Sequence, residues 1–304
     1  MVETCGGPAT QAWLSELPGL VATAQAVTVT IVENVLMARN AWRMRLACPD
    51  IARRILPGQF FMIRAGGRSD PLLGRPFALY DIWTNDAGEP QGIDFSYVVV
   101  GKMTTLLSQL TAGDTAEIWG PLGNGFPPPV NGHLALVAGG IGQTPFLAVI
   151  REALRRRKYG QPPRNLSEFP SRITLCYGVR NIEYLAGVDE FQAEGIDVRI
   201  ATDDGTHGHH GFVTQLLQQL INEPHPPDRI YCCGPEPMMR ATVKVAEAST
   251  IPCWLSLETP MACGFGACFS CVTPIRQDDG TWDYRRVCVE GPVFPAEQVA
   301  FDTV

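Results

Sequence analysis

Four cysteines in the C-terminal part of the chain have the spacing of an iron–sulfur site. Four residues separate Cys263 from Cys268, two separate Cys268 from Cys271, and sixteen more precede Cys288. Four thiolates with this spacing bind a [2Fe–2S] cluster. The residues Gly264–Ala267 permit a tight loop whose backbone N–H groups face the sulfurs and offset the negative charge of the cluster. A structural zinc site is the alternative, but it favours paired C-x2-C knuckles.

A glycine-rich turn follows an apolar run at residues 133–138, and a helix-like segment comes after it. A strand that enters such a turn and then a helix forms a phosphate cradle, because free N–H groups and the helix dipole favour an anion. We expect Thr144 to cap the helix and Pro145 to lie in its first turn. A tight turn without a ligand would look similar, since the third glycine of the usual fingerprint is missing. The candidate contacts are Gly139, Gly140 and Gly142.

Two more strand-like runs end in turns suited to a nucleotide. One ends at Thr202–Gly205 and the other at Cys233–Pro235. Ligands of open α/β sheets bind at the carboxyl ends of the strands, so the three turns are expected to face one crevice. Asp203 or Asp204 would accept a hydrogen bond from a ribose 2′-hydroxyl and repel a 2′-phosphate, which favours NAD; an ordinary acidic turn is the alternative. The contacts expected from the other turn are Cys233, Gly234 and Pro235.

Two further sets of possible ligands are less informative. Three histidines in a glycine-rich loop could bind a metal, but without companion ligands a solvated turn is favoured. They are His207, His209 and His210. Five cysteines without ligand spacing are expected to be buried, reduced thiols. They are Cys5, Cys48, Cys176, Cys232 and Cys253.

A flavin would connect the one-electron chemistry of an iron–sulfur cluster with the two-electron chemistry of a nicotinamide. Arg75 stands at the start of an apolar strand, and glycine-containing turns follow at 101–105 and 120–126. An arginine with nearby N–H groups can hold a pyrophosphate, although a surface arginine beside a barrel turn is the alternative. A nicotinamide transfers two electrons as hydride and an iron–sulfur cluster takes one at a time, whereas a flavin can do both.

The first part of the chain has the pattern of an antiparallel barrel. Residues 26–126 contain short alternating runs broken by proline and glycine, and this pattern is typical of such a sheet. The expected strands include Val27–Val32, Gln59–Arg64, Phe77–Ile82, Phe95–Val100 and Thr115–Trp119. A proline-rich linker at 126–132 ends this part.

The second part alternates apolar strands with helices, which indicates a doubly wound parallel sheet. The expected strands are Leu134–Ala138, Ile173–Tyr177, Val198–Ala201 and Arg229–Cys233, with helices at Pro145–Arg156 and Glu236–Ala248 and a surface loop at Tyr159–Pro170. A small module rich in cysteine and glycine follows, and a module of this size needs a cross-link such as a metal centre to be stable. The predicted divisions are an extension at 1–25, a barrel at 26–127, an α/β domain at 132–250 and a cluster module at 251–304.

Composition excludes several classes of protein. The 304 residues are 45% hydrophobic and 18% charged, as in a well-packed globular protein. The net charge of -7 argues against binding to nucleic acid. No apolar stretch is long enough for a transmembrane segment, and residues 1–20 lack the basic start of a signal peptide. Ten cysteines in a chain of this length indicate a cytoplasmic protein with a metal centre rather than a secreted disulfide protein.

The order of barrel, nucleotide domain and cysteine module resembles the ferredoxin reductase superfamily. Within it, the sequence is most similar to the electron-transfer subunit of the NAD-dependent (class 1B) dihydroorotate dehydrogenases, over about residues 26–300. The motifs that carry the resemblance are Arg75-Pro76, Gly120–Phe126, Gly139–Pro145, Thr202–Gly205, Cys233–Pro235, Met261–Gly264 and Val287–Phe294. Ala78 departs from the family, where serine or threonine is usual, and Met103 replaces a glycine.

The resemblance implies an FAD in the barrel and a role in pyrimidine biosynthesis. Electrons from dihydroorotate would pass from the FMN of a catalytic partner subunit, in a heterotetramer, to the cluster, then to FAD and NAD. Cys233 would lie beside the nicotinamide, although a buried strand-end thiol is an equal alternative, and no acid or base is assigned. The implied FAD contacts are Arg75, Pro76, Phe77, Ala78, Tyr97, Val98, Val99, Met103 and Thr104.

Two other functions remain open at this point. The same cofactors could serve a reductase of a ferredoxin, a hydrogenase-like complex or an oxygenase, and copurification of the partner would distinguish them. A non-enzymatic redox sensor or a zinc-stapled binding module is a third hypothesis. Purified protein without flavin and cluster absorption would favour that third class.

Overall fold

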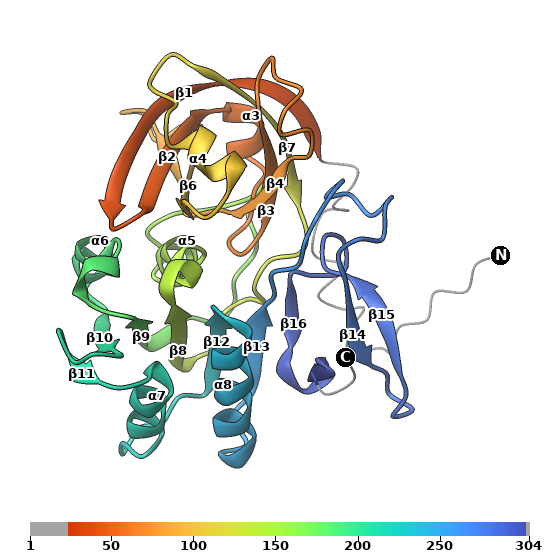
Figure 1. The fold of residues 1–304 in the computed structure, drawn as a ribbon. Coiled ribbons are helices and arrows are strands. Elements are labelled where there is room, and N and C mark those ends of the chain that lie inside the picture. Colours follow the sequence, from red (N-terminus) through yellow and green to blue (C-terminus); the bar gives the residue numbers. More distant parts are fainter. Residues whose placement is uncertain (1–23, 302–304) are drawn as a thin grey trace.

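The computed structural model describes residues 24–301 and arranges them as two seven-stranded sheets and a C-terminal hairpin (Figure 1). The extension predicted at 1–25, which includes Cys5, lies almost wholly outside the described residues. Within residues 24–301, no helix combines the length and apolar character needed to cross a membrane.

The first sheet is antiparallel and curls into the predicted barrel. Its strand order is β4-β3-β7-β1-β2-β6-β5. The strands are β1 (Gln25–Ala38), β2 (Ala41–Ala47), β3 (Phe60–Ala65), β4 (Arg75–Ala78), β5 (Asp81–Thr84), β6 (Pro90–Val98) and β7 (Thr115–Leu122), with short helices α3 (Pro49–Ala52) and α4 (Lys102–Leu107). Aromatic rings fill the interior, where Phe95 lies 5.3 Å from Phe61 and 4.9 Å from Phe77 between ring centroids.

One strand of the barrel was predicted wrongly. The expected single strand Phe77–Ile82 is divided between β4 and β5, which lie at opposite edges of the sheet. Leu79 donates its N–H to Gln59 next to β3, and Tyr80 donates its N–H to Asp94 in β6. These two residues therefore carry the chain from one edge to the other and bring the edges together, which a run of apolar residues does not reveal.

The second sheet is parallel except for its last strand, in the order β11-β10-β9-β8-β12-β13-β16. Its strands are β8 (Gly132–Gly139), β9 (Pro170–Val179), β10 (Asp197–Thr202), β11 (His209–His210), β12 (Arg229–Cys233), β13 (Cys253–Ser256) and β16 (Val293–Pro295). Its helices are α5 (Phe146–Ala153), α6 (Val188–Ala193), α7 (Val213–Ile221) and α8 (Glu236–Ala248), with 3-10 turns η1 (Gly140–Gln143), η2 (Ile182–Tyr184) and η3 (Ala296–Gln298). Helix α8 has the predicted bounds.

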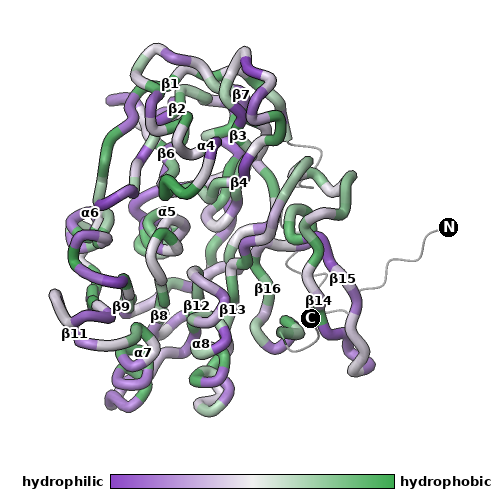
Figure 2. The backbone as a smooth tube through the Cα atoms, in the orientation of Figure 1, coloured by the Kyte–Doolittle hydropathy of each residue, from purple (hydrophilic) through white to green (hydrophobic). Residues whose placement is uncertain are grey.

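Strand β8 shows why this sheet is covered on both faces. Leu134 and Leu136 belong to the core shared with α5, while Ala135 and Val137 belong to the core shared with α7 and α8. Both sets are buried, so the strand is apolar along its centre (Figure 2). This is the predicted doubly wound arrangement.

Charged side chains join the barrel to the nucleotide domain. Asp81 of β5 is almost fully buried and forms ion pairs with Arg151 of α5 and with Arg157. Arg151 also contacts Glu194 at 2.7 Å between Nε and Oε1. These contacts hold α5 and the segment after it against the base of the barrel.

The C-terminal residues do not form a separate body. Strand β13 continues the parallel sheet beside β12, and β16 pairs with it in the antiparallel sense. Between them lies the hairpin of β14 (Val272–Arg276) and β15 (Trp282–Arg286), which forms a separate two-stranded sheet. The limits predicted for the domains remain predictions, but two strands of the range 251–304 hydrogen-bond into the second sheet.

Asn124 fastens the end of the barrel to the segment that follows Cys288. Its side chain is fully buried, and Nδ2 donates to the carbonyls of Glu290 and Val293. Oδ1 accepts the N–H of Val293 at 2.9 Å. All three bonds connect residues far apart in sequence, so they position the cysteine module relative to the barrel.

We expect Asn124→Leu to lower the free energy of unfolding by about 2–3 kcal/mol, because it leaves buried backbone groups without partners. Urea unfolding measures this loss, and hydrogen exchange should accelerate at 290–294. Asn85→Ala is the control, since Asn85 Oδ1 accepts two N–H groups in an exposed turn. Equal losses in the two variants would contradict the anchoring role of Asn124.

Candidate functional site

Two glycines shape the loop that carries the predicted cluster ligands. Gly264 and Gly266 have φ values of +80° and +88°, which side chains rarely adopt. A Cβ on Gly264 would lie 2.5 Å from Cγ of Met62 in β3, so the loop rests directly on the barrel. Arg286 of β15 donates to the carbonyl of Gly266 at 3.2 Å and closes the loop from the other side.

The four cysteines lie in two contacting pairs. The thiol of Cys268 interacts with that of Cys263, and the thiol of Cys288 interacts with that of Cys271 and more weakly with that of Cys263. Cys271 and Cys288 are buried, whereas Cys268 is exposed. The Ser270 hydroxyl, 3.1 Å from the Cys268 Sγ, lowers the pKa of Cys268 to about 6. Burial raises the pKa of Cys288 to about 12, and the neighbouring Cys271 thiol adds to the shift.

This arrangement fits two iron atoms better than one zinc ion. A tetrahedral zinc site needs its four ligands around one point. Within residues 24–301 no three His, Cys, Asp or Glu side chains converge in this way. Two pairs of thiols match a cluster in which each iron takes two cysteines. The backbone N–H of Gly266 also points at the Cys288 sulfur, which stabilises negative charge there.

The histidines after Asp204 form no metal site in the described residues. His209 Nε2 lies 2.9 Å from the side-chain oxygen of Gln215, and the ring of His210 packs over Gly205. The solvated turn remains a prediction. Four of the other cysteines are buried as predicted: Cys48, Cys176, Cys232 and Cys253. The fifth, Cys5, lies outside the described residues.

The glycine-rich turn leads from β8 into η1 and then α5. Gly140 has a φ of +56°, and a Cβ built on it would meet nothing within 4 Å. A Cβ on Gly142 would overlap the carbonyl oxygen of Cys233 at the end of β12. Gly140 therefore leaves open space for a ligand, while Gly142 allows two strand ends to pack together.

The predicted cap of α5 is wrong. Pro145, not Thr144, occupies the N-cap position, and α5 has no side-chain cap. The Thr144 hydroxyl donates to the carbonyl of Ile141 at 2.6 Å. A 3-10 turn separates the glycines from the helix, so the threonine stabilises that turn instead.

The three predicted turns all lie at the carboxyl ends of the parallel strands in the second sheet. The turns at Gly139 and Cys233 touch, because a Cβ on Gly139 would lie 2.9 Å from Cδ of Pro235. Strand β9 lies between β8 and β10. Asp203 and Asp204, which follow β10, are therefore two strands away from the glycine turn at the same end of the strands, as an extended dinucleotide requires. Asp203 and Asp204 are both exposed, and the carboxylate of Asp204 accepts a hydrogen bond from the Thr206 hydroxyl at 2.7 Å. Burial raises the pKa of the Cys233 thiol to about 12, with Glu258 contributing.

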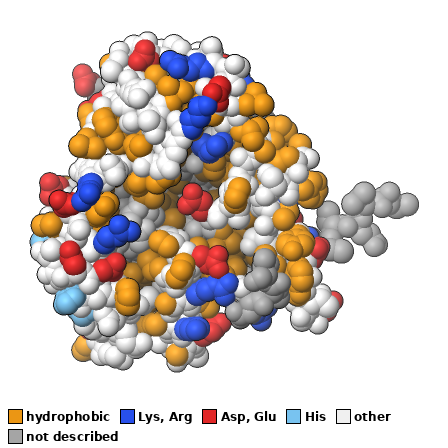
Figure 3. All heavy atoms as spheres, viewed as in Figure 1, with side chains coloured by type: hydrophobic (Ala, Val, Ile, Leu, Met, Phe, Trp, Pro, Cys, Tyr) orange, Lys and Arg blue, Asp and Glu red, His pale blue; other side chains and the backbone are white. Residues whose placement is uncertain are grey.

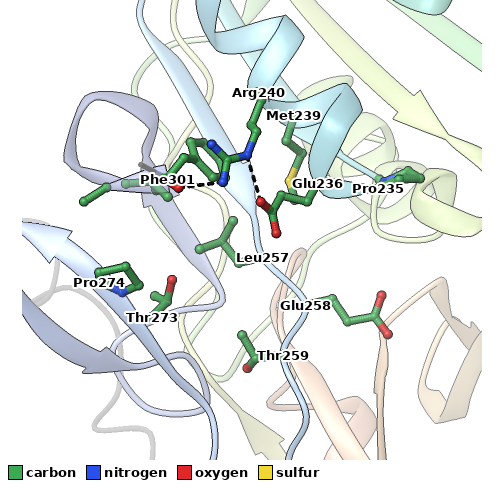
Figure 4. A pocket seen from close by; sticks show the side chains of 13 residues that line it. Pro235, Glu236, Met239, Arg240, Leu257, Glu258, Thr259, Thr273, Pro274 and Phe301 are labelled. Carbon is green, nitrogen blue, oxygen red and sulfur yellow. Dashed lines mark hydrogen bonds and ion pairs between the residues drawn. The ribbon is translucent and has the colours of Figure 1, made fainter. Parts of the chain in front are cut away.

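A cavity of about 370 Å³ lies where the nucleotide domain meets the cysteine module (Figure 4). Gly234, Pro235 and residues of α8 form one side, and Leu257, Glu258 and Thr259 form the other. Arg240 lies across its edge, where Nε donates to Glu236 at 2.8 Å. The cavity extends the crevice from the Cys233–Pro235 turn toward the cluster loop.

The segment implied to bind FAD contains exposed and buried residues. Arg75 is exposed on the edge strand β4, and Phe77 packs against Tyr97 at 5.9 Å between ring centroids. The side chains of Tyr97 and Met103 point into the barrel core, so only their backbone groups can face a ligand. The remaining expected contacts, Pro76, Ala78, Val98 and Val99, are half-buried.

Thr104 shapes the turn before α4. Its hydroxyl oxygen accepts the N–H groups of Val100 and Gly101 at 3.0 and 3.1 Å. A Cβ on Gly101 would meet nothing within 4 Å, so backbone and open space adjoin there. This fits a turn that a bulky anionic group approaches closely.

Gln143 is a buried polar residue in the turn that follows β8. Its side chain is fully buried in η1, and neither amide atom has a hydrogen-bond partner among the described residues. Such a group is costly to leave unpaired. The open space at Gly140 and Gly101 fits a cofactor between barrel and nucleotide domain, where the molecule is hollowed (Figure 3).

Phe212 is a candidate contact that the sequence analysis missed. It follows β11, and its side chain is 67% exposed. The N–H of Gly211 donates to the carbonyl of Thr202, so the backbone next to Phe212 lies beside the turn of Asp203. An exposed aromatic ring here could stack on an adenine. A lone phenylalanine before a helix gave no signal in the sequence.

Comparison with known proteins first defines the class. The structure is similar to that of an NADH-dependent reduced ferredoxin-NADP oxidoreductase, with a TM-score of 0.74 and 29% identity over 90% of each chain. It also resembles a cytochrome P450 reductase of Amycolatopsis, with a TM-score of 0.59 and 25% identity over 74% of this chain and 66% of that one. The fold and site are those of a flavin and iron–sulfur oxidoreductase with a ferredoxin reductase-like fold.

The family follows from the sequence matches. Residues 136–244 match the oxidoreductase NAD-binding domain, and 258–300 match the iron-sulfur cluster binding domain of dihydroorotate dehydrogenase B. The chain is 35% identical to the electron transfer subunit of dihydroorotate dehydrogenase B (NAD(+)) from Desulforamulus reducens, over 88% of this chain and 95% of that one. It is 36% identical to the corresponding subunit from Clostridium acetobutylicum, over 87% of this chain and 93% of that one. The chain belongs to this family of electron transfer subunits.

Proposed function

We propose that this chain passes electrons from the oxidation of dihydroorotate, by an FMN-containing partner subunit, to NAD in pyrimidine biosynthesis. The observation that carries the proposal is the set of four cysteines, of which Cys268 is exposed, on a loop that rests on the barrel. Electrons enter at the cluster and leave at the nucleotide. The proposed assembly of this chain with the catalytic subunit is a heterotetramer.

The need for three cofactors follows from their chemistry. The cluster on Cys263, Cys268, Cys271 and Cys288 carries one electron at a time, and NAD accepts two as hydride. FAD, held by the edge strand at Arg75–Ala78 and by the turn of Thr104, converts one process into the other. The chain itself orients the cofactors and excludes water, and no general acid or base is assigned.

The proposed partner surface surrounds the exposed end of the cluster loop. The side chains of Phe265 and Phe269 are 48% and 61% exposed there. Hydrophobic side chains gather on this flank of the molecule (Figure 3). Exposed aromatic residues beside a redox centre suit a protein interface, since they bury apolar area next to the point of electron transfer.

A reductase that serves a ferredoxin is the second candidate. The 29% identity with the NADH-dependent ferredoxin-NADP oxidoreductase, over 90% of both chains, favours it. The cofactor sites would be the same, and only the partner would differ. Sequence similarity to the dihydroorotate dehydrogenase subunits is higher, so the first candidate is preferred.

Purification of the native complex distinguishes the two candidates. The proposal predicts an FMN protein that copurifies with this chain and reduces NAD when dihydroorotate is added. Copurification of a different stable partner, together with no dihydroorotate oxidation, would reject the first candidate in favour of the second.

Asp203 is expected to set the preference for NAD over NADP. We expect Asp203→Asn to lower the ratio of kcat/KM for NAD to kcat/KM for NADP by about tenfold, because the repulsion of a 2′-phosphate is worth about 1.4 kcal/mol. Steady-state kinetics with both nucleotides measure the ratio. Asp86→Asn, in an exposed barrel turn, should leave it unchanged. An unchanged ratio in Asp203→Asn would show that the 2′-position lies elsewhere.

A further inference from the structure

Trp119 connects the barrel to the loop of cluster ligands. It lies in β7, where it pairs with Ala26 of β1 and Met62 of β3. Its indole Nε1 donates to the carbonyl oxygen of Cys263 at 2.7 Å. The donor therefore comes from a strand of the barrel, and the acceptor is the backbone of an expected iron ligand.

The other edge of the same indole touches the chain that enters the flavin strand. A Cβ built on Gly74 would lie 2.5 Å from Cη2 and 3.2 Å from Cζ2 of Trp119. Gly74 is buried and immediately precedes Arg75. One side chain therefore contacts both the start of β4 and the cluster loop.

The contact is held in place by its neighbours. A Cβ on Gly264 would lie 2.5 Å from Cγ of Met62 and 3.1 Å from Cδ1 of Leu122. The peptide that joins Cys263 to Gly264 thus rests on β3 and β7, with the indole hydrogen bond at one end. Movement of Trp119 would shift that peptide.

We propose that Trp119 is a positioning residue that sets the reduction potential of the cluster and couples the cluster loop to the flavin strand. Hydrogen bonds around the ligands of an iron–sulfur cluster tune its potential, and donors that offset the cluster's charge raise it. A donor to the Cys263 carbonyl polarises the peptide that follows and strengthens its N–H. The inference rests on the proposed binding of a cluster by the four cysteines.

The test is Trp119→Phe, which keeps a ring in the same place and removes the donor. Trp83→Phe is the matched control, since Trp83 Nε1 donates to the Leu46 carbonyl at 3.1 Å within the barrel and away from the cluster loop. The full chain, with any subunit that copurifies, is analysed for iron and flavin content. Its reduced cluster is examined by EPR, and its midpoint potential by redox titration.

We expect Trp119→Phe to retain iron and flavin, to lower the midpoint potential of the cluster and to change its g values. Trp83→Phe should match the wild type in all of these. A potential and spectrum of Trp119→Phe that equal those of Trp83→Phe would overturn the proposal. None of these readouts needs dihydroorotate, so they are independent of the partner's identity.

Gly74→Ala gives a second route if Trp119→Phe does not accumulate as folded protein. The added methyl group would collide with Cη2 of Trp119 and therefore displace the indole. The indole N–H group itself is still present in this variant. The expected result is again a lower midpoint potential with bound flavin and iron. An unchanged potential in this variant would overturn the coupling between the flavin strand and the cluster loop.

Discussion

Cys271→Ser is expected to remove the iron–sulfur absorption and the EPR signal of the reduced cluster, while FAD remains bound at the wild-type level. Cys271 is buried and its thiol contacts that of Cys288, so loss of one leaves an iron with a single cysteine. A serine hydroxyl ionises much less readily than a thiol and is a poor replacement for a thiolate ligand. Electron transfer to or from the partner should fall by more than about 100-fold, because the one-electron path is lost.

The control for this experiment is Cys253→Ala. Cys253 is also buried, but it lies in β13 and burial raises its pKa well above the usual value for a thiol. This variant should keep the cluster and the flavin, with only a modest loss of stability. Loss of cluster signals in both variants, or in neither, would mean that the ligands are wrongly assigned.

A second large effect is expected from the pair Gly140→Ala and Gly142→Ala. At Gly142 the new Cβ would overlap the backbone of Cys233, so the ends of β8 and β12 must separate. We expect a loss of about 3 kcal/mol in the free energy of unfolding, the range for overpacking of a close contact. Urea unfolding of the full chain with its cofactors measures it.

At Gly140 the expected loss is of another kind. The Cβ would meet nothing within 4 Å, and the left-handed backbone costs about 1–2 kcal/mol. Stability should therefore fall less than in Gly142→Ala. The affinity for NADH should fall by at least about tenfold, because the methyl group occupies the space through which a pyrophosphate approaches the turn. Wild-type affinity in Gly140→Ala would contradict a phosphate cradle at this turn.

The sequence predicted the features that depend on local spacing. The iron–sulfur module, the glycine turn after β8 and the helix Glu236–Ala248 were recognised because cysteine spacing, a strand–turn–helix pattern and helical periodicity are local. The assignment of the four cysteines as ligands remains a prediction. Matches to the two domain families confirm the predictions of a cluster and of NAD.

What the sequence did not reveal depends on contacts between distant residues. The break of Phe77–Ile82 into β4 and β5 arises from the closure of the barrel, because Leu79 and Tyr80 bond to different edges. Trp119 and Phe212 have no motif, and their importance appears only when Cys263 and Thr202 are placed beside them.

The most direct test of the proposed electron path is dihydroorotate-dependent reduction of NAD by the native complex, compared between the wild type and Cys271→Ser. The wild-type complex should form NADH, and the complex that carries Cys271→Ser should form almost none. The variant should still oxidise NADH with an artificial acceptor that takes electrons from the flavin. Equal rates of NADH formation in the two complexes would contradict a path through the cluster.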